Sequence, residues 1–426
     1  MCSTSDTRTT TATPRTTTEL ATLIGRVHAA APHAHTAINL VPSENRMSPT
    51  AHAMLATDYT NRYCFHDTMT GAWEFRGGEA VAELEIAGRG AFTRLADAEY
   101  VNLRPISGLN AMTIVLAALA GPRGSTVVSI APASGGHHAT GELITLLGHR
   151  AVTVDCTRGR VDLEQLDRIL TSATVPLVYL DLQNSRHILD TAAVADLLDD
   201  HPGTRLHVDI SHTLGLVLGG AHPNPLDQGA GSAGGSLHKT FPGPHHGVLF
   251  TRDDTTAELL RRAQRCLLSS HHFGHALAAA VTALEFEHYG AEYAAAVLVN
   301  ARTLASALSE HWFDVVADHN GFTETHQVWV RLDDPVRMSD HLAQWGIRVN
   351  VQSDLPGCPG PMWRLGTAEP TVLGAGAEEM RALAAIAAAA RDSDLVRGRL
   401  AVKQLQDRIR ARPWWSRHMD AKAGDS

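Results

Sequence analysis

Two ionisable residues occupy positions from which they can hold opposite ends of one small molecule. Asp209 ends the apolar run RLHVD, and Lys239 follows thirty residues later in GGSLHKTFPG. In open α/β sheets, ligands bind beyond the carboxyl ends of the strands. Pyridoxal phosphate (PLP) needs a lysine for an imine and an acid that keeps its pyridine nitrogen protonated, so that the ring accepts electrons from a bond broken at Cα. The pair predicts a PLP site, in which burial would favour the nucleophilic, unprotonated Lys239.

Each residue alone also has an ordinary interpretation. An aspartate at a strand end often caps a helix or forms a turn, and a lysine before a threonine usually belongs to the solvated surface. The two together, with small residues before the lysine and a Pro/Gly turn after it, favour the cofactor site.

The segments around this pair alternate between short apolar runs and helical patterns. From Val101 onward, strand-like runs such as STVVSIAP and VPLVYLDL are separated by helical patterns such as VDLEQLDRILTS. This spacing is typical of βαβ units and a mostly parallel sheet. We expect a disordered Thr-rich tail (1–18), an N-terminal helix and arm (19–50), a large PLP-binding α/β domain (51–290), a small C-terminal α+β domain (291–412) and a loose tail (413–426).

The composition argues against several other classes of protein. The formal charge of −9 over 426 residues, without a basic stripe, argues against a nucleic-acid partner. No apolar stretch approaches the ~20 residues that span a bilayer, and the Thr-rich start lacks the apolar core of a secretory signal. Five scattered cysteines without CxxC spacing predict reduced thiols in a cytoplasmic protein. The 25 histidines include adjacent pairs but no HExxH or acidic cluster, so we predict no metal site.

Six segments resemble those of one enzyme family, in the same order along the chain. They are VPSENRMSP, RPISGLNA, ASGGHHATG, HVDISHTLGL, SLHKTFPGPHHG and MWRLGTAEPT, and the family is the serine hydroxymethyltransferases. The resemblance runs from about Asn39 to the final Ala-rich helix. It implies an α/β, fold-type I PLP-dependent transferase with a large, mostly parallel-sheet domain and a smaller C-terminal α+β domain. It also implies a homodimer with shared active sites.

The resemblance assigns cofactor contacts to five of these positions. Lys239 would form the imine, Asp209 would bind the pyridine nitrogen and His212 would lie near the ring hydroxyl. Ser107 and Gly108 in RPISGLNA would hold the phosphate, in agreement with the anion-binding character of a small-residue turn that opens a helix.

Two further cofactor contacts depend on histidines. His137 in ASGGHHATG resembles the histidine that stacks on the ring face, and the preceding Gly-Gly pair favours it over His138. Its ordinary interpretation is a loop histidine with satisfied hydrogen bonds. Leu109 stands where the family often has a second hydroxyl, so one phosphate contact is lost, and His238 is a candidate to supply another.

Substrate contacts follow from the same resemblance. Arg364 in MWRLGTAEPT resembles the arginine that binds the substrate carboxylate in a bidentate fork; its ordinary interpretation is an interdomain salt bridge. Ser43 would assist at the same carboxylate, and Tyr63 would act in substrate binding and catalysis. His271 and Gly274 in SSHHFGH fall where the family has a loop that reaches the neighbouring subunit's phosphate.

The sequence departs from the family where folate chemistry would take place. Phe65 stands at the position of a glutamate that handles protons at the folate-bound carbon, and a phenyl ring can neither donate nor accept a proton. His66, Asp67 and Glu74 are candidates to replace it.

A second group of departures lies in the C-terminal part. Gln352 stands where an asparagine is expected, the stretch from 350 to 364 is shorter than its folate-binding counterpart, and GTAEPTVLG has Glu369 and lacks the usual arginine. These departures make tetrahydrofolate a doubtful cofactor.

We therefore expect PLP-dependent cleavage and formation of the Cα–Cβ bond of a β-hydroxy-α-amino acid, through a glycine quinonoid. The preferred hypothesis is a folate-independent threonine-type transaldolase or aldolase of amino-acid or antibiotic biosynthesis, acting on an amino acid and an aldehyde. One alternative is a serine or α-methylserine hydroxymethyltransferase with a remodelled folate pocket. Another is a non-catalytic PLP-fold partner protein, against which the retention of both Lys239 and Arg364 argues.

Overall fold

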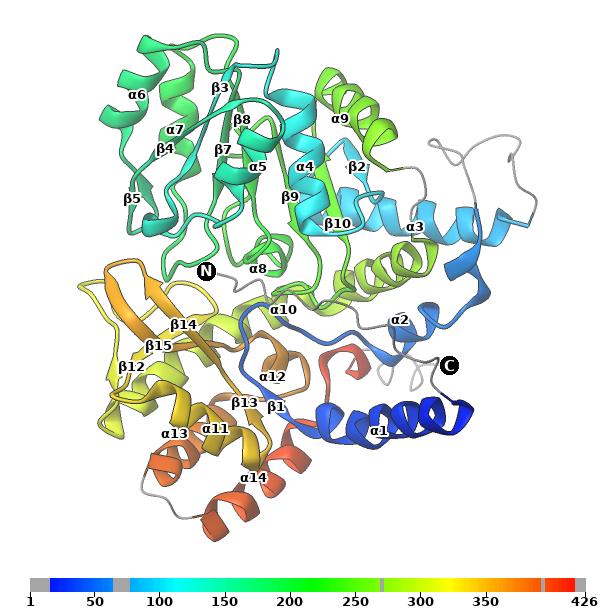
Figure 1. Ribbon diagram of the computed structural model, residues 1–426, viewed down its shortest axis with the longest axis vertical. Helices are drawn as coiled ribbons and strands as arrows, with labels where there is room; N and C mark the ends of the chain where they lie inside the picture. Colours follow the sequence, from blue (N-terminus) through cyan, green and yellow to red (C-terminus); the bar gives the residue numbers. More distant parts are fainter. Residues whose placement is uncertain (1–15, 64–76, 269–271, 392–394, 418–426) are drawn as a thin grey trace.

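The larger sheet occupies the upper half of the molecule in Figure 1. The computed structural model describes residues 16–63, 77–268, 272–391 and 395–417. The strands of this sheet are β2 (Tyr100–Asn102), β3 (Thr126–Ile130), β4 (Arg150–Val154), β7 (Leu177–Asp181), β8 (Arg205–Asp209), β9 (Ser232–Ser236) and β10 (Gly247–Thr251). Within the described residues their order is β2-β10-β9-β8-β7-β3-β4. The five strands from β9 to β4 are parallel, and β10 is antiparallel to both its neighbours. The predicted α/β fold with a mostly parallel sheet is confirmed.

The central strands are buried on both faces of the sheet. Every residue of β3, β7, β9 and β10 is buried, which explains apolar runs without polar alternation. β9 has the sequence SAGGS because neighbouring backbone lies very close to it. A Cβ on Gly234 would lie 2.2 Å from the carbonyl oxygen of Val248.

Helices connect these strands, and aspartates begin several of them. The helices are α3 (Glu79–Ala96), α4 (Gly108–Leu119), α5 (Thr140–Leu146), α6 (Leu163–Ser172), α7 (Thr191–Leu198), α8 (Leu214–Leu218) and α9 (Asp254–Leu267), with a 3-10 turn η2 (Pro132–Ser134) and the short pair β5 (Cys156–Thr157) and β6 (Arg160–Val161). Asp162, Asp190 and Asp253 each accept a hydrogen bond from the main-chain N–H three residues later. Such caps satisfy N–H groups that the helix itself leaves without partners.

A smaller antiparallel sheet lies below the first in Figure 1. Its strands are β11 (Asp314–Val315), β12 (Gln327–Arg331), β14 (Asn350–Leu355) and β15 (Cys358–Gly366), and the accompanying elements are α11 (Pro335–Trp345), β13 (Ile347–Arg348), α12 (Ala368–Val372), α13 (Ala377–Arg391), α14 (Leu395–Ile409) and η3 (Trp414–Ser416). Within the described residues the strand order is β11-β12-β15-β14.

One helix of 38 residues, α10 (Phe273–Glu310), connects the two sheets. It packs against α3 beside the large sheet and against α13 beside the small one. The expected boundary between residues 290 and 291 falls inside this helix, so the chain has no linker there. Alanine has the highest helix propensity, so the Ala-rich sequence of α10 favours one continuous helix.

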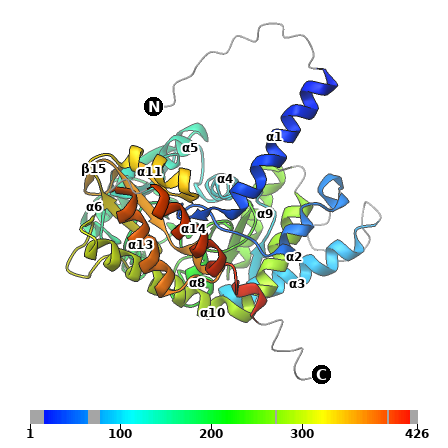
Figure 2. The same cartoon turned by 90° about the horizontal axis from the view of Figure 1, so that it is seen from below.

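The N-terminal segment reaches back across the small sheet. It contains α1 (Thr17–Thr36), β1 (Ile38–Asn39), α2 (Pro49–Met54) and η1 (Asp58–Asn61), and β1 pairs in parallel with β13. α1 begins at Thr17, two residues before the expected boundary, because Thr16 and Glu19 form a capping box. No residue of α1 is buried, and the helix projects from the body of the molecule (Figure 2).

The expectation of a loose tail from residue 413 is wrong for its first residues. Trp414 is only 7% exposed, and the guanidinium of Arg417 lies 3.7 Å from the centre of its ring. An aromatic side chain gains enough from burial to hold such a turn in place.

Of the helices in the described ranges, none has the length and apolar character that crossing a bilayer requires.

Candidate active site

A cavity opens at the carboxyl ends of β7 and β8, next to the loop after β9 and the start of α4. Of the predicted cofactor contacts that fall within the described residues, seven line it: Ser107, Gly108, His137, Asp209, His212, His238 and Lys239. The other lining residues are Leu109, Met112, Asp181, Leu182, Gln183, Ser211 and Ser236. Because parallel strands end at one edge of the sheet, residues far apart in the sequence meet there.

Asp209 is held in a fixed orientation at the end of β8. Its Oδ2 accepts a hydrogen bond from the hydroxyl of Tyr179 at 2.9 Å, and its Oδ1 accepts one from the main-chain N–H of Ser211 at 2.8 Å. Gly235, with φ of +141°, leaves the space beside it open, since a Cβ there would lie 2.9 Å from Oδ1. Each carboxylate oxygen has a further lone pair, so Asp209 can also accept a pyridine N–H.

The main chain at Lys239 is fixed by two distant residues. Asn45 Nδ2 donates to the carbonyl oxygen of Lys239 at 2.6 Å and to that of Thr240 at 3.2 Å. The Tyr293 hydroxyl also donates to the Thr240 carbonyl, at 2.7 Å. The backbone that presents the lysine is therefore held from the N-terminal arm and from α10.

The side chain of Lys239 is placed for nucleophilic chemistry. Its Nζ donates to Ser236 Oγ. Burial lowers the pKa of Lys239 to about 8, with the charge of Asp209 opposing this shift and that of Arg364 adding to it. About a tenth of the amine is therefore unprotonated at pH 7, far more than for an exposed lysine, and the unprotonated amine is the nucleophile.

His137 is an uncharged imidazole at the wall of the cavity. Burial lowers the pKa of His137 to about 4, against the opposing charge of Asp209. Its Nδ1 accepts a hydrogen bond from the main-chain N–H of Ala139 at 3.2 Å, so the ring proton is assigned to Nε2. His138 stacks on it at 4.5 Å but is exposed and does not line the cavity, which favours His137 as the ring-stacking residue.

The start of α4 forms another wall of the cavity. Ser107 caps the helix through a bond from the main-chain N–H of Asn110 at 3.0 Å. Gly108 follows, and a Cβ there would lie 2.8 Å from the Cβ of Ser236. The N–H groups of a first helical turn can bind a phosphate. Burial lowers the pKa of His238 to about 3, so this histidine can contribute a neutral hydrogen bond but no charge.

Arg364 is a buried cation without a carboxylate partner in the described part of the chain. Its side chain is 2% exposed, and one nitrogen, Nη1, donates to Asn184 Oδ1 and, at 2.8 Å, to Gln352 Oε1. Its Nε has no acceptor. A salt bridge was the ordinary interpretation of Arg364, and none of the described acids makes one. Its charge lowers the pKa of both Lys239 and His212, which places the guanidinium beside the cavity.

Ser43 lies on the arm that crosses β15. The carbonyl of Pro42 accepts a hydrogen bond from His326 Nε2 at 3.1 Å, and a Cβ on Gly366 would lie 2.4 Å from Pro42 Cα. The arm therefore crosses β15 at Gly366, two residues after Arg364. Ser43 itself does not line the cavity. Glu369 binds the arm as well, through Asn39 at 2.7 Å.

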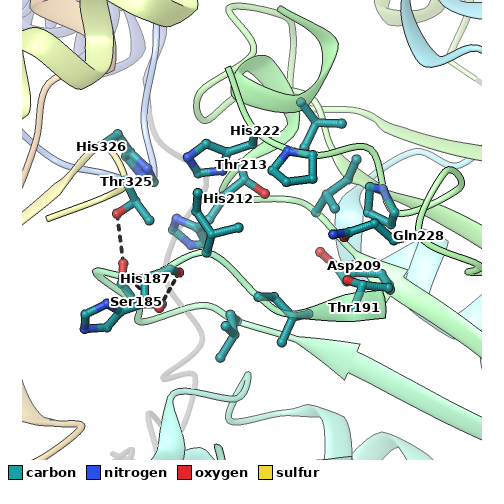
Figure 3. Close-up of a pocket in the computed structure, with 18 of the residues that line it drawn as sticks. Ser185, His187, Thr191, Asp209, His212, Thr213, His222, Gln228, Thr325 and His326 are labelled. Carbon is teal, nitrogen blue, oxygen red and sulfur yellow. Dashed lines mark hydrogen bonds between the residues drawn. The ribbon is translucent and has the colours of Figure 1, made fainter. Parts of the chain in front are cut away.

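A second cavity, drawn in Figure 3, shares Leu182, Asp209 and His212 with the first. His212 stacks on His326 with their ring centres 5.7 Å apart. Burial lowers the pKa of His212, His222 and His326, so these rings are uncharged near neutral pH. These three histidines therefore place no positive charge beside Asp209.

The loop after β7 connects the two sheets beside this second cavity. Thr325 Oγ1 donates to the Ser185 carbonyl at 2.9 Å, as the dashed line in Figure 3 marks. The main-chain N–H of Glu324 donates to the Arg186 carbonyl at 2.8 Å, and Arg186 donates to the Phe322 carbonyl at 2.7 Å. The segment that carries Asn184 is thus attached to the small sheet.

The structure does not bring every predicted residue to this cavity. Tyr63 is 53% exposed, and Gly274 packs near Thr60 and Met54; neither lines the cavity. His271 and Phe65 lie outside the described residues, as do the suggested substitutes His66, Asp67 and Glu74.

Some residues at the site were not predicted. Asp181 and Gln183 line the cavity, Asn184 bonds to Arg364, and Asn45 holds the lysine backbone. The first three belong to LDLQNS, which spans the end of the buried strand β7, just as Asp209 ends β8. The rule that ligands bind beyond the carboxyl ends of parallel strands would therefore have identified them. A further signal was the rarity of lysine: Lys239 is one of three lysines in the chain.

These groups fit PLP. The chain offers a lysine amine, an oriented carboxylate, an uncharged imidazole and a helix start for the phosphate, and a buried guanidinium nitrogen still lacks an acceptor. In the described ranges, no three His, Cys, Asp or Glu side chains are grouped to hold a metal ion.

This combination on an α/β scaffold defines the fold-type I class of PLP-dependent enzymes. A model of the family described as serine hydroxymethyltransferase matches residues 19–386. The chain belongs to the serine hydroxymethyltransferase family.

Relatives within and near this family differ in their activities. An L-threonine:uridine-5'-aldehyde transaldolase of a Streptomyces species is 52% identical over 88% of this chain and 92% of the relative. A serine hydroxymethyltransferase of Pyrobaculum arsenaticum is 34% identical over 82% of each chain. The solved structure of an L-threonine transaldolase from Pseudomonas fluorescens, in its internal aldimine state, has a TM-score of 0.82 at 24% identity and covers 94% of both chains. This last likeness supports the fold.

Proposed function

We propose that the protein is a PLP-dependent transaldolase that transfers the glycine unit of L-threonine to a nucleoside 5'-aldehyde. Three relatives that are 49–52% identical to it carry the name L-threonine:uridine-5'-aldehyde transaldolase. The observation that carries the amino-acid part of the proposal is Arg364, a buried guanidinium without an acid partner among the described residues and beside Lys239. A substrate carboxylate supplies the missing partner.

Bound PLP supplies an electron sink that stabilises negative charge at Cα after the Cα–Cβ bond breaks. In our proposal, Lys239 would hold the cofactor covalently through its side-chain amine, which lines the cavity. Asp209 keeps the pyridine nitrogen protonated, which the bonds from Tyr179 and Ser211 favour by fixing the carboxylate as an acceptor. His137 covers one face of the ring as a neutral imidazole, so it adds no charge that opposes the pyridinium.

Arg364 determines which bond breaks. A bidentate arginine fixes the substrate carboxylate in one plane, and this sets the rotation about N–Cα. Arg364 would thereby select the Cα–Cβ bond as the one whose electrons the cofactor ring could accept. Gln352 and Asn184 occupy Nη1, which leaves the remaining guanidinium donors for the carboxylate. Cleavage of the threonine Cα–Cβ bond would release acetaldehyde as the β-hydroxyl gives up its proton. Cα of the remaining glycine unit would then form a bond to the aldehyde carbon of the acceptor, whose oxygen would take up a proton.

We expect the reaction to proceed without tetrahydrofolate. Purified protein with L-threonine and uridine-5'-aldehyde should release acetaldehyde in step with consumption of the acceptor, and added tetrahydrofolate should not change the rate. A coupled alcohol dehydrogenase assay measures the acetaldehyde, and mass spectrometry identifies the new β-hydroxy amino acid. Acetaldehyde release that ignores the acceptor would instead indicate an aldolase. Serine turnover that requires tetrahydrofolate would indicate a hydroxymethyltransferase.

We also propose a homodimer whose subunits share active sites. α1 has no buried residue although it has exposed Leu20, Ile24 and Val27 on one side, and helices in proteins gain most of their stability by packing such an apolar face against a partner. A second copy of the chain would cover it. Tyr63 lies away from the cavity of its own chain, which is consistent with a place in the neighbouring one.

Mixing two inactive variants tests this arrangement. Lys239→Ala and Tyr63→Ala subunits, refolded together and purified as tagged heterodimers, should regain activity, because one site would then combine an intact lysine with an intact tyrosine from the other subunit. Each variant alone should stay inactive. A heterodimer that remains inactive would mean that Tyr63 serves its own chain or no active site.

A further inference from the structure

Asp181 is a second carboxyl group at the cofactor cavity, and unlike the half-buried Asp209 it is fully buried. It ends β7 and is the register partner of Asp209 at the end of the parallel strand β8. Paired residues of neighbouring strands project to the same face of a sheet about 5 Å apart, so the two carboxyl groups are neighbours. Asp181 is 3% exposed and lines the same cavity as Lys239 and His137.

The contacts of Asp181 lead to the turn that carries His137. Its Oδ2 accepts a hydrogen bond from Thr140 Oγ1 at 2.5 Å. Thr140 is the first residue of α5, and the side chain of the residue before it, Ala139, provides no cap. The main-chain N–H of His137 also lies close enough to lower the pKa of the Asp181 carboxyl. The other carboxylate oxygen of Asp181, Oδ1, is buried and accepts no hydrogen bond from the described residues.

Burying this acid beside a second one is costly. Burial raises the pKa of Asp181 to about 7; the negative charge of Asp209 adds to the shift, while Thr140 and the main-chain N–H groups oppose it. Tyr179, on the same strand, is close to both carboxylates. Burial raises the pKa of Tyr179, and the negative charges of Asp209 and Asp181 raise it further. A small apolar side chain would fill this position in a strand without the desolvation cost. The fold alone therefore does not account for an acid here.

We propose that Asp181 is a positioning residue that holds the turn from His137 to Thr140, and through it the imidazole of His137, against the ring of the bound cofactor. This inference rests on the proposed PLP site. Asp209 acts on the ring nitrogen directly, whereas Asp181 acts through His137. A loosened turn would let the imidazole leave the ring face, and stacking of this kind stabilises a bound ring.

A double-mutant cycle with His137 tests the inference. Apoprotein is titrated with PLP and the dissociation constant is measured from the visible absorption. Asp181→Asn keeps the shape of the side chain and an oxygen that can accept from Thr140, but removes the charge. We expect it to weaken PLP binding about tenfold, because the bonds that hold the turn lose their charge assistance. In a His137→Ala background, the same substitution should change the dissociation constant less than about twofold, because coupled residues are not additive.

Visible circular dichroism of the bound cofactor gives a readout that a purely structural role would not change. Asp181→Asn and His137→Ala should reduce this signal to a similar extent, and the double variant should equal His137→Ala. Asp190→Asn, at the cap of α7, is the matched control and should leave both readouts unchanged, since asparagine caps helices as well as aspartate does. If Asp181→Asn does not fold, Thr140→Val removes the hydrogen bond from Thr140 to Asp181 and should show the same coupling.

The possible outcomes separate the inference from the proposed function. A full loss of affinity that persists in the His137→Ala background would overturn the positioning role, as would an Asp181→Asn variant that binds PLP normally. Either result leaves the transaldolase proposal intact. Wild-type protein that takes up no PLP would overturn both.

Discussion

Replacing Lys239 with alanine is expected to abolish the visible absorption that arises when PLP is linked to a lysine, and to reduce transaldolase activity by on the order of 10³-fold or more, as removal of catalytic nucleophiles does elsewhere. The reason is that the chain has three lysines, and Lys403 is exposed on α14 while Lys422 lies outside the described residues. Neither is placed to replace an amine whose pKa is lowered to about 8 inside the cavity. Absorption spectra of the purified, PLP-saturated variant measure this directly.

Lys403→Ala is the matched control for this experiment. This substitution removes a lysine from the surface of the protein. The variant should keep both the visible absorption band and the activity of the wild type. A Lys239→Ala protein that retains an unchanged band would show that another residue holds the cofactor, and the assignment of this site would fail.

Replacing Arg364 with alanine is expected to weaken the binding of L-threonine and to leave PLP affinity nearly unchanged. Loss of a buried, charge-assisted contact typically costs ~2–4 kcal/mol, which corresponds to about 30- to 1000-fold in the threonine dissociation constant. The guanidinium is 2% exposed and has no carboxylate partner in the described chain, so the bound substrate would supply its only acid. Titration of the holoenzyme with threonine, followed by the change in cofactor absorption, measures the effect.

Two comparison variants sharpen this prediction. Arg364→Lys keeps the charge but loses the planar fork, so it should bind threonine with intermediate affinity. Arg331→Ala removes an arginine from the neighbouring strand β12, where it pairs with Asp314 at 3.4 Å, and should bind threonine as the wild type does. Equal losses of threonine and PLP affinity in Arg364→Ala would indicate that the residue supports the fold.

The sequence was sufficient to predict the sheet and to identify seven residues that line one cavity at its edge. Apolar runs that end in polar residues define strand ends, and parallel strands align those ends along one edge of the sheet. This rule placed Asp209, and the small-residue turn at Ser107 placed the start of α4. The same rule applied to LDLQNS would also have identified Asp181.

Other parts of the site depend on contacts that a local pattern does not contain. Asn45 reaches the carbonyl of Lys239 from 194 residues away, and Asn184 meets Arg364 across 180 residues. Their partners are set by how the arm and the small sheet fold back on the large one. The burial of Trp414 has the same origin, since a polar flanking sequence gives no sign of the surface on which the indole packs.

The partners of the N-terminal arm also set an order of assembly. β1 pairs with β13, Pro42 accepts a bond from His326, and Asn39 binds Glu369, so every one of these anchors is translated some 300 residues after the arm itself. Contacts between such distant positions form slowly. Until these anchors emerge from the ribosome, the arm that carries Asn45 is not fixed, although the partners of Asn45 itself are already translated. We therefore expect stable capture of the vitamin-derived cofactor to wait until translation is almost finished.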